Sequence, residues 1–144
     1  MFKKILVPVD IDYTETASAV YQRAAAIAKL SGAEIRIVSV MPGFGMPIVA
    51  SYISDETRKE IAHRLRQSLE AFIKENCEEP VSYEVRTGKN WEEIIKIANT
   101  WKADLIVVYY DHRRDINEVH SGSCAQRVTE NANCSVLWLR NILS

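Results

Sequence analysis

Short apolar runs alternate along the chain with longer segments of helical periodicity, and this alternation restricts the fold more than any other feature. Five runs have the length and residue types of β-strands, and they span Lys4–Val9, Glu34–Val40, Val81–Arg86, Leu105–Tyr109 and Ser135–Arg140. Strands joined through helices run parallel, because each parallel connection needs a crossover. We therefore expect an α/β fold, Rossmann-like, in which helices cover both faces of an open parallel sheet.

The segment after the first strand has clear helix signals at both ends. Asp12 followed by Glu15 is typical of a capping box. Apolar residues recur at helical spacing from Ala17 to Ala28, and Gly32 follows where helices commonly end. These signals predict a helix that begins next to the end of the first strand.

Three further helices are predicted between the later strands. A long helix is expected from Ser54, and Asn90 with Glu93 indicates the start of another. A short helix is expected from about Ser123 to Ala132. The irregular segment Met41–Ile53 is rich in Gly, Pro and apolar residues, and long loops of this kind are usually functional or mobile.

The strand sequences also indicate positions within the sheet. Leu105–Tyr109 is apolar at every position, which predicts a central strand. Val81–Arg86 alternates between apolar and polar residues, as an edge strand does. Pro8 cannot donate a hydrogen bond to a neighbouring strand, so we place it at the end of the first strand, toward the ligand side.

Composition excludes several classes of protein. The 144 residues fit a single domain spanning 1–144, with 47% hydrophobic and 26% charged residues. A formal charge of -1 gives no support for a nucleic-acid or anionic-membrane partner. The first apolar run is too short for a signal peptide, and no stretch has the length of a membrane span.

The cysteines and histidines show no metal-ligand spacing. Cys77, Cys124 and Cys134 form no CxxC pair, and an odd number of cysteines indicates reduced thiols in a cytoplasmic protein. His63 lies on a charged helix face, where we expect it to be exposed, and His120 can simply fill a loop. We expect neither a structural metal nor disulfides.

Polar residues follow the strands at the edge where parallel sheets bind ligands. Asp10 and Asp12 come after the first strand, Val40 ends the second, and His112, Arg113 and Arg114 come after the fourth. Asp10 and Asp12 could bind Mg²⁺, although the capping pattern explains Asp12 better. The three cationic residues could donate to an anion at the same edge.

The last helix should begin at this edge, and it supports two interpretations. Its first N–H groups, those of Ser123, Cys124 and Ala125, would point at an anion, and Gly122 would let a phosphate approach the backbone. Cys124, at a helix N-terminus, could also have a lowered pKa. Alternatively, Ser and Gly form an ordinary helix cap and the Arg pair is solvated.

The order of these pieces resembles the universal stress protein family over nearly the whole chain. The segments that carry the resemblance are KKILVPVD, EIRIVSV, ADLIVVYYDHR, SGS and CSVLWLR. The resemblance implies a five-stranded parallel sheet in the order 3-2-1-4-5, and many members are dimers. One branch binds ATP through a signature that reads G-x-x-G, nine residues, then G-S/T. By this resemblance Asp10 and Val40 would contact the adenine and ribose, and Gly122, Ser123 and Cys124 the phosphates.

The chain departs from that signature after the fourth strand. Tyr110 and Arg113 stand where small residues are expected, and the spacing to Gly122 is one residue shorter. Side chains at 110 and 113 crowd the phosphates, whereas Arg113 could replace lost backbone bonds with charge-assisted ones. The histidine-arginine loop resembles one subgroup with a degenerate signature. The full set of candidate contacts is Pro8, Val9, Asp10, Val40, Tyr110, His112, Arg113, Gly122, Ser123, Cys124 and Ala125.

Two functions from different classes follow from these features. The first is an adenine-nucleotide-binding protein of bacterial stress response or signalling that takes ATP or AMP, with or without Mg²⁺. Because no Walker lysine precedes the Ser and no good catalytic base is present, any ATP hydrolysis would be slow. The second is a ligand-free structural or signalling homodimer, or a higher oligomer, paired through the apolar last strand at Val136, Leu137, Trp138 and Leu139.

Two other functions of similar folds are excluded. A phosphorylatable receiver domain needs an Asp at the end of the third strand, where this chain has Val85, Arg86 and Thr87. A flavodoxin-like carrier needs a Ser/Thr-rich phosphate loop after the first strand, where the acids Asp10 and Asp12 would repel a phosphate.

Overall fold

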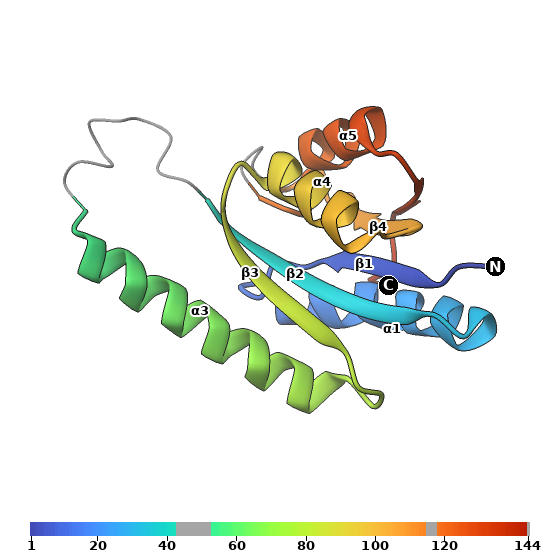
Figure 1. Cartoon of the computed structure of the whole chain (residues 1–144), viewed down its shortest axis with the longest axis horizontal. Coiled ribbons are helices and arrows are strands. Elements are labelled where there is room, and N and C mark those ends of the chain that lie inside the picture. The colour runs from blue at the N-terminus through green and yellow to red at the C-terminus, as the bar shows by residue number, and fades with distance from the viewer. Residues whose placement is uncertain (43–52, 115–117, 144) are drawn as a thin grey trace.

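Five parallel strands form a single sheet in the order β3-β2-β1-β4-β5 (Figure 1). A computed structural model describes residues 1–42, 53–114 and 118–143. The strands are β1 (Lys4–Pro8), β2 (Glu34–Pro42), β3 (Ser82–Gly88), β4 (Leu105–Tyr109) and β5 (Ser135–Leu139). The expected α/β class and strand order are confirmed.

Among the described residues, two helices cover each face of the sheet (Figure 1). On one face lie α1 (Thr14–Ser31) and α3 (Asp55–Asn76), and on the other lie α4 (Asn90–Trp101) and α5 (Gly122–Asn131). The sheet therefore separates two apolar clusters, as a doubly covered parallel sheet requires.

The central strands are buried on both faces because, apart from Lys4 at the start of β1, their residues are apolar. In β4, Val107 packs in the cluster under α1 and α3, while its neighbour Ile106 packs in the cluster under α4 and α5. All five residues of β4 are buried, so its predicted central position is confirmed. Leu6 in β1 is fully buried and packs on the same side as Ile106.

The predicted capping box at the start of α1 is wrong. The helix begins at Thr14, and the residue before it, Tyr13, makes no side-chain cap. The chain turns tightly after β1, with the N–H of Tyr13 donating to the Asp10 carbonyl at 3.1 Å. Asp12 lies within that turn, where its own N–H donates to Asp10 Oδ1 at 3.0 Å and its side chain is exposed.

The predicted cap at Asn90 is wrong as well. Lys89 precedes α4, and Asn90 is its first helical residue. The Asn90 amide instead donates to the Glu118 carbonyl at 3.2 Å, which ties α4 to the segment before α5. Glu93 accepts from Arg86 Nε at 3.1 Å and therefore joins α4 to β3 rather than closing a capping box.

Other predicted ends agree with the structure or shift by a few residues. The hydroxyl of Ser54 accepts the N–H of Thr57 at 3.1 Å and caps α3, and Gly32 ends α1 with φ 70°. The edge strand predicted at 81–86 lies at the sheet edge but runs from 82 to 88, and β5 ends at Leu139. β2 continues through Pro42, and residues 43–52 of the predicted loop lie outside the described residues.

Within the described ranges, no helix combines the length and apolar character needed to cross a membrane.

Because β1 is buried, replacing a leucine by alanine there should destabilise the protein far more than the same replacement at an exposed position. Leu6→Ala removes a fully buried side chain and should lower the free energy of unfolding by about 2–5 kcal/mol. Leu30→Ala on α1 removes a side chain that is 89% exposed, and it should change stability by less than about 0.5 kcal/mol. Urea denaturation of both variants measures the difference, and equal losses would contradict this description of the core.

Candidate functional site

The carboxyl ends of β1, β2 and β4 meet at one edge of the sheet, as predicted. Pro8 is the last residue of β1 and lies opposite Val38 of β2, so its predicted position at the strand end is confirmed. The next residue, Val9, donates its N–H to the Val38 carbonyl at 2.9 Å and is fully buried. Asp10 therefore leaves the sheet from a fixed backbone.

A pocket of about 420 Å³ opens at this edge, and we call it the edge pocket. Val9, Asp10 and Val40, three of the predicted contact residues, line it. Other lining residues were not predicted from the sequence, among them Ser39 of β2, Arg64 of α3 and Glu118 before α5. Its volume lies within the range of about 300–1,000 Å³ that is usual for small-molecule sites.

Among the charged side chains that line the edge pocket, acids outnumber cations. Asp10, Asp12 and Glu118 line it, together with the single guanidinium of Arg64. Burial raises the pKa of the Asp10 carboxyl, while the hydrogen bond from the N–H of Asp12 lowers it. Such a wall can accept hydrogen bonds from hydroxyl and amino groups of a ligand.

Arg114 is held within the protein at the border of this pocket. Its guanidinium carbon lies 3.4 Å from the centre of the Tyr13 ring, a cation–π contact. Arg114 Nε also lies 3.4 Å from Asp111 Oδ2 and 3.9 Å from Glu118 Oε2. The hydroxyl of Tyr13 donates to Glu118 Oε1 at 3.4 Å, so these groups form one network.

Asp111, directly after β4, organises the basic loop. Its side chain accepts from Arg113 Nε at 2.9 Å, from Arg113 Nη2 at 2.8 Å and from the Arg113 N–H at 3.0 Å. These hydrogen bonds hold the pKa of Asp111 well below its usual range. The charge of Arg113 is thus directed at Asp111, whereas His112 is exposed.

α5 begins at Gly122, one residue before the predicted start at about Ser123. Ser121 is the cap, and its hydroxyl accepts the N–H of Cys124 at 3.1 Å. The Ser121 carbonyl accepts the N–H of Ala125 at 3.1 Å. Two of the three N–H groups expected to face an anion are therefore occupied. Among the described residues, those of Gly122 and Ser123 at the helix start have no hydrogen-bond acceptor.

The ring of Tyr110 fills the space beside Gly122. A Cβ at position 122 would lie 2.5 Å from Tyr110 Cε2, closer than real contacts allow. Gly122 thus admits a neighbouring side chain on this side, and its contact with a phosphate stays a prediction. Cys124 does not have the lowered pKa that a helix N-terminus can cause, because burial raises the pKa of its thiol to about 12.

Six of the eleven predicted contact residues line one of two pockets, and Pro8, His112, Arg113, Cys124 and Ala125 line neither. Tyr110, Gly122 and Ser123 line a second, open pocket of about 810 Å³, which we call the helix pocket, together with Arg127, Trp138 and Arg140. Among the described residues, the edge pocket and the helix pocket have no lining residue in common. The described lining therefore places the two groups of residues in separate pockets.

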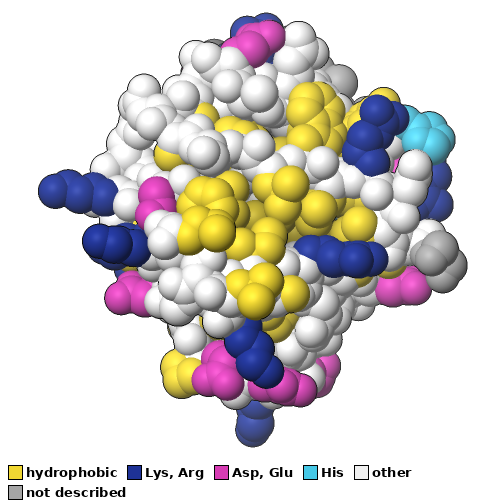
Figure 2. Space-filling model, turned by 90° about the vertical axis from the view of Figure 1, so that its right-hand side faces the viewer, with side chains coloured by type: hydrophobic (Ala, Val, Ile, Leu, Met, Phe, Trp, Pro, Cys, Tyr) yellow, Lys and Arg dark blue, Asp and Glu magenta, His cyan; other side chains and the backbone are white. Residues whose placement is uncertain are grey.

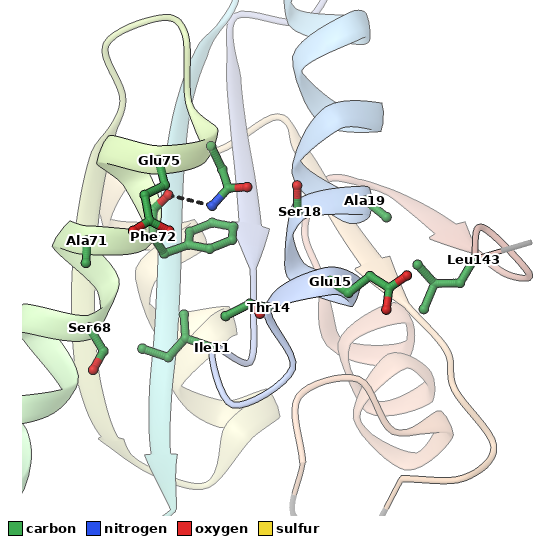
Figure 3. Close-up of a pocket in the computed structure, with 11 residues that line it drawn as sticks. Ile11, Thr14, Glu15, Ser18, Ala19, Ser68, Ala71, Phe72, Glu75 and Leu143 are labelled. Atoms are coloured by element: carbon green, nitrogen blue, oxygen red, sulfur yellow. Dashed lines mark hydrogen bonds between the residues drawn. The ribbon is translucent and has the colours of Figure 1, made fainter.

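A third pocket, of about 710 Å³, lies between α1 and α3 beside the edge pocket (Figure 3). Ile11 and Ser68 line both pockets. Glu15 and Glu75 line the third pocket, and its described lining includes no Lys, Arg or His. A nucleotide phosphate would find no counter-charge there.

Comparison with known proteins identifies the family. The sequence model described as the universal stress protein family matches residues 1–140. The chain belongs to the universal stress protein family. It is 32% identical to Universal stress protein MJ0531 of Methanocaldococcus jannaschii, an alignment that covers 97% of this chain and 83% of that protein.

Solved structures share the fold of this universal stress protein. The hypothetical protein MJ0577 superposes with a TM-score of 0.76 at 25% identity, covering 100% of this chain and 99% of that one. A universal stress protein in complex with cAMP superposes with a TM-score of 0.62 at 22% identity, with 96% of each chain covered. The first of these agrees with the five-stranded order found here.

Sequence reasoning missed Arg64 and Glu118 because nothing near them in the sequence indicates a site. Arg64 lies next to Leu65 of the apolar stripe of α3, more than fifty residues from Asp10. Glu118 lies in the loop between β4 and α5, whose path depends on Asp111 and Asn90. Only the packing of α3 and that loop against β1 and β2 brings these charges to the pocket.

The buried His120 should make the folding stability of this universal stress protein sensitive to acid. The ring is fully buried, its two nitrogens have no hydrogen-bond partner among the described residues, and it meets the Tyr109 ring edge-on. Burial lowers the pKa of His120 to about 4, below its ordinary 6.5. As the pH falls, His120 is protonated in the unfolded chain at a higher pH than in the folded protein. The free energy of unfolding should therefore fall by about 3 kcal/mol between pH 6.5 and pH 4.

Urea denaturation across that pH range measures the effect. His120→Phe keeps a ring and loses no hydrogen bond, so it should remove the histidine contribution to the pH dependence. His63→Phe changes an exposed histidine and should retain the wild-type dependence. An identical pH dependence in wild type and His120→Phe would contradict the assignment.

Proposed function

We propose that this universal stress protein, acting as one domain over residues 1–144, binds an adenine nucleotide in the edge pocket and works in a cytoplasmic stress response or signalling pathway. The ligand is ATP or AMP, with Mg²⁺ arriving on the nucleotide. Among the described residues no three His, Cys, Asp or Glu side chains are grouped to hold a metal ion. The bacterial setting expected from the sequence is part of this proposal.

The observation that carries the proposal is the position of Asp10 and Val40. Asp10 follows the end of β1, Val40 lies near the end of the neighbouring strand β2, and both line the same pocket, as the resemblance implies for the adenine and ribose contacts. A carboxylate beside an apolar side chain suits a nucleoside, since the carboxylate accepts from ribose hydroxyls and the apolar group packs on the base. The complex of a related fold with cAMP supports the ligand class.

Calorimetric titration of the whole chain with AMP, and with ATP in the presence and absence of Mg²⁺, tests this function. Asp10→Asn removes the negative acceptor and should weaken binding at least about tenfold, the size expected for a lost hydrogen bond to a charged group. Asp55→Asn changes an exposed acid at the start of α3 and should leave affinity unchanged. Absence of binding heat at millimolar nucleotide would refute the proposal.

The edge strand β5 favours a second candidate function, a homodimer or higher oligomer that acts through self-association. β5 pairs only with β4 among the described strands, and Trp138 on it is 38% exposed. Figure 2 shows the molecule from the side where β5 lies, and hydrophobic side chains gather in the middle of that face with charged side chains around them. Apolar strand edges favour pairing with another chain.

Charge on β5 should prevent this association. Trp138→Glu places a carboxylate in the apolar patch and should shift the protein to monomers in sedimentation velocity experiments. Leu30→Glu puts the same charge at another exposed apolar residue, on α1, and should leave the sedimentation coefficient unchanged. An oligomer that survives Trp138→Glu would place the interface elsewhere.

A further inference from the structure

The predicted nucleoside contacts and the predicted phosphate contacts line two different pockets, and this separation bears on how many phosphates a bound nucleotide can carry. The inference rests on the proposed function. The nucleoside contacts Asp10 and Val40 line the edge pocket, whereas Gly122 and Ser123, with the open N–H groups of α5, line the helix pocket. A triphosphate bound by both groups would have to extend from one pocket to the other. The residues after β4 lie at the end of that path.

Tyr110 is held in place at this point by contacts on several sides. Its backbone N–H donates to the Leu139 carbonyl at 3.0 Å. Its ring lies against the Cα of Gly122, edge-on to Trp138 at 6.0 Å between centres, and under the guanidinium of Arg140 at 4.8 Å. These contacts favour the position in which the ring covers the approach to Gly122.

Charge in the edge pocket also disfavours a long phosphate chain. The acids Asp10 and Glu118 line the pocket, and the nearby cations are already paired: Arg113 with Asp111, and Arg114 with both Asp111 and Glu118. Arg64 on α3 also lines the pocket, and its Nη2 pairs with Glu60 Oε1 on the same helix at 2.8 Å, where both side chains are exposed. Each further phosphate adds negative charge beside fixed carboxylates, which raises the electrostatic cost of binding.

We propose that the edge pocket selects adenine nucleosides and their monophosphates over ATP, and that Tyr110 is a specificity-determining residue that excludes the outer phosphates. A single phosphate can stay near Arg64 without passing Tyr110. The residue acts through its ring, because the ring atoms Cε2, Cδ2 and Cζ are those that approach Gly122.

Dissociation constants for adenosine, AMP and ATP, measured by calorimetry on the full chain at fixed Mg²⁺, test the selectivity. The wild-type protein should bind AMP at least about tenfold more tightly than ATP. Tyr110→Gly opens the approach to Gly122 and should bring the ATP and AMP constants within about threefold of each other. Tyr110→Phe keeps the ring and should retain the wild-type ratio.

The outcomes separate this inference from the proposed function. If ATP binds wild type as tightly as AMP, or if Tyr110→Gly leaves the ratio unchanged while adenosine still binds, the selectivity is refuted and nucleotide binding stands. If none of the three ligands binds wild type, the proposed function fails and the selectivity fails with it. The wild-type comparison needs no variant, so misfolding of Tyr110→Gly cannot prevent a decision.

Discussion

The requirement that β1 and β4 be buried on both faces determines where everything else lies. Strands without polar side chains need helices on both sides, and parallel pairing with helical crossovers supplies them. All five carboxyl ends then point the same way, so the first residues able to carry charge, Asp10 and Asp111, emerge at one edge. The site is therefore a consequence of the core, since the apolar strands end where the acids begin.

At that edge, Asp111 decides what the basic loop can do. A buried carboxylate needs partners, because an unpaired one costs several kcal/mol. Asp111 obtains them from Arg113 and Arg114, the guanidinium groups that could otherwise have met a ligand anion. The carboxylate of the neighbouring Glu118 also pairs with Arg114. A loop rich in positive residues is thus electrostatically close to neutral, and counting cations in the sequence overstates its attraction for phosphate.

The sequence predicts the fold better than the site for a physical reason. Apolar periodicity is a local property, and it placed β4, its central position and the end of α1 at Gly32 correctly. The helix start predicted at Asp12 failed because its N–H donates to Asp10 in a local turn, and the one at Asn90 failed because its amide donates to the distant Glu118 carbonyl. Local turns and tertiary contacts both compete with helix capping.

Gly122 illustrates the same limit at the ligand site. A glycine at a helix start is compatible with two arrangements, an anion against the backbone or a side chain packed in the same space. The residue that decides between them lies twelve positions earlier: with a small residue at 110 the space would be open, whereas Tyr110 fills it. Because Trp138 and Arg140 of the last strand segment hold that ring, the character of the phosphate end depends on β5 as much as on α5. An oligomer that formed through β5 would touch the same residues, so the proposed self-association would be coupled to the proposed nucleotide selectivity.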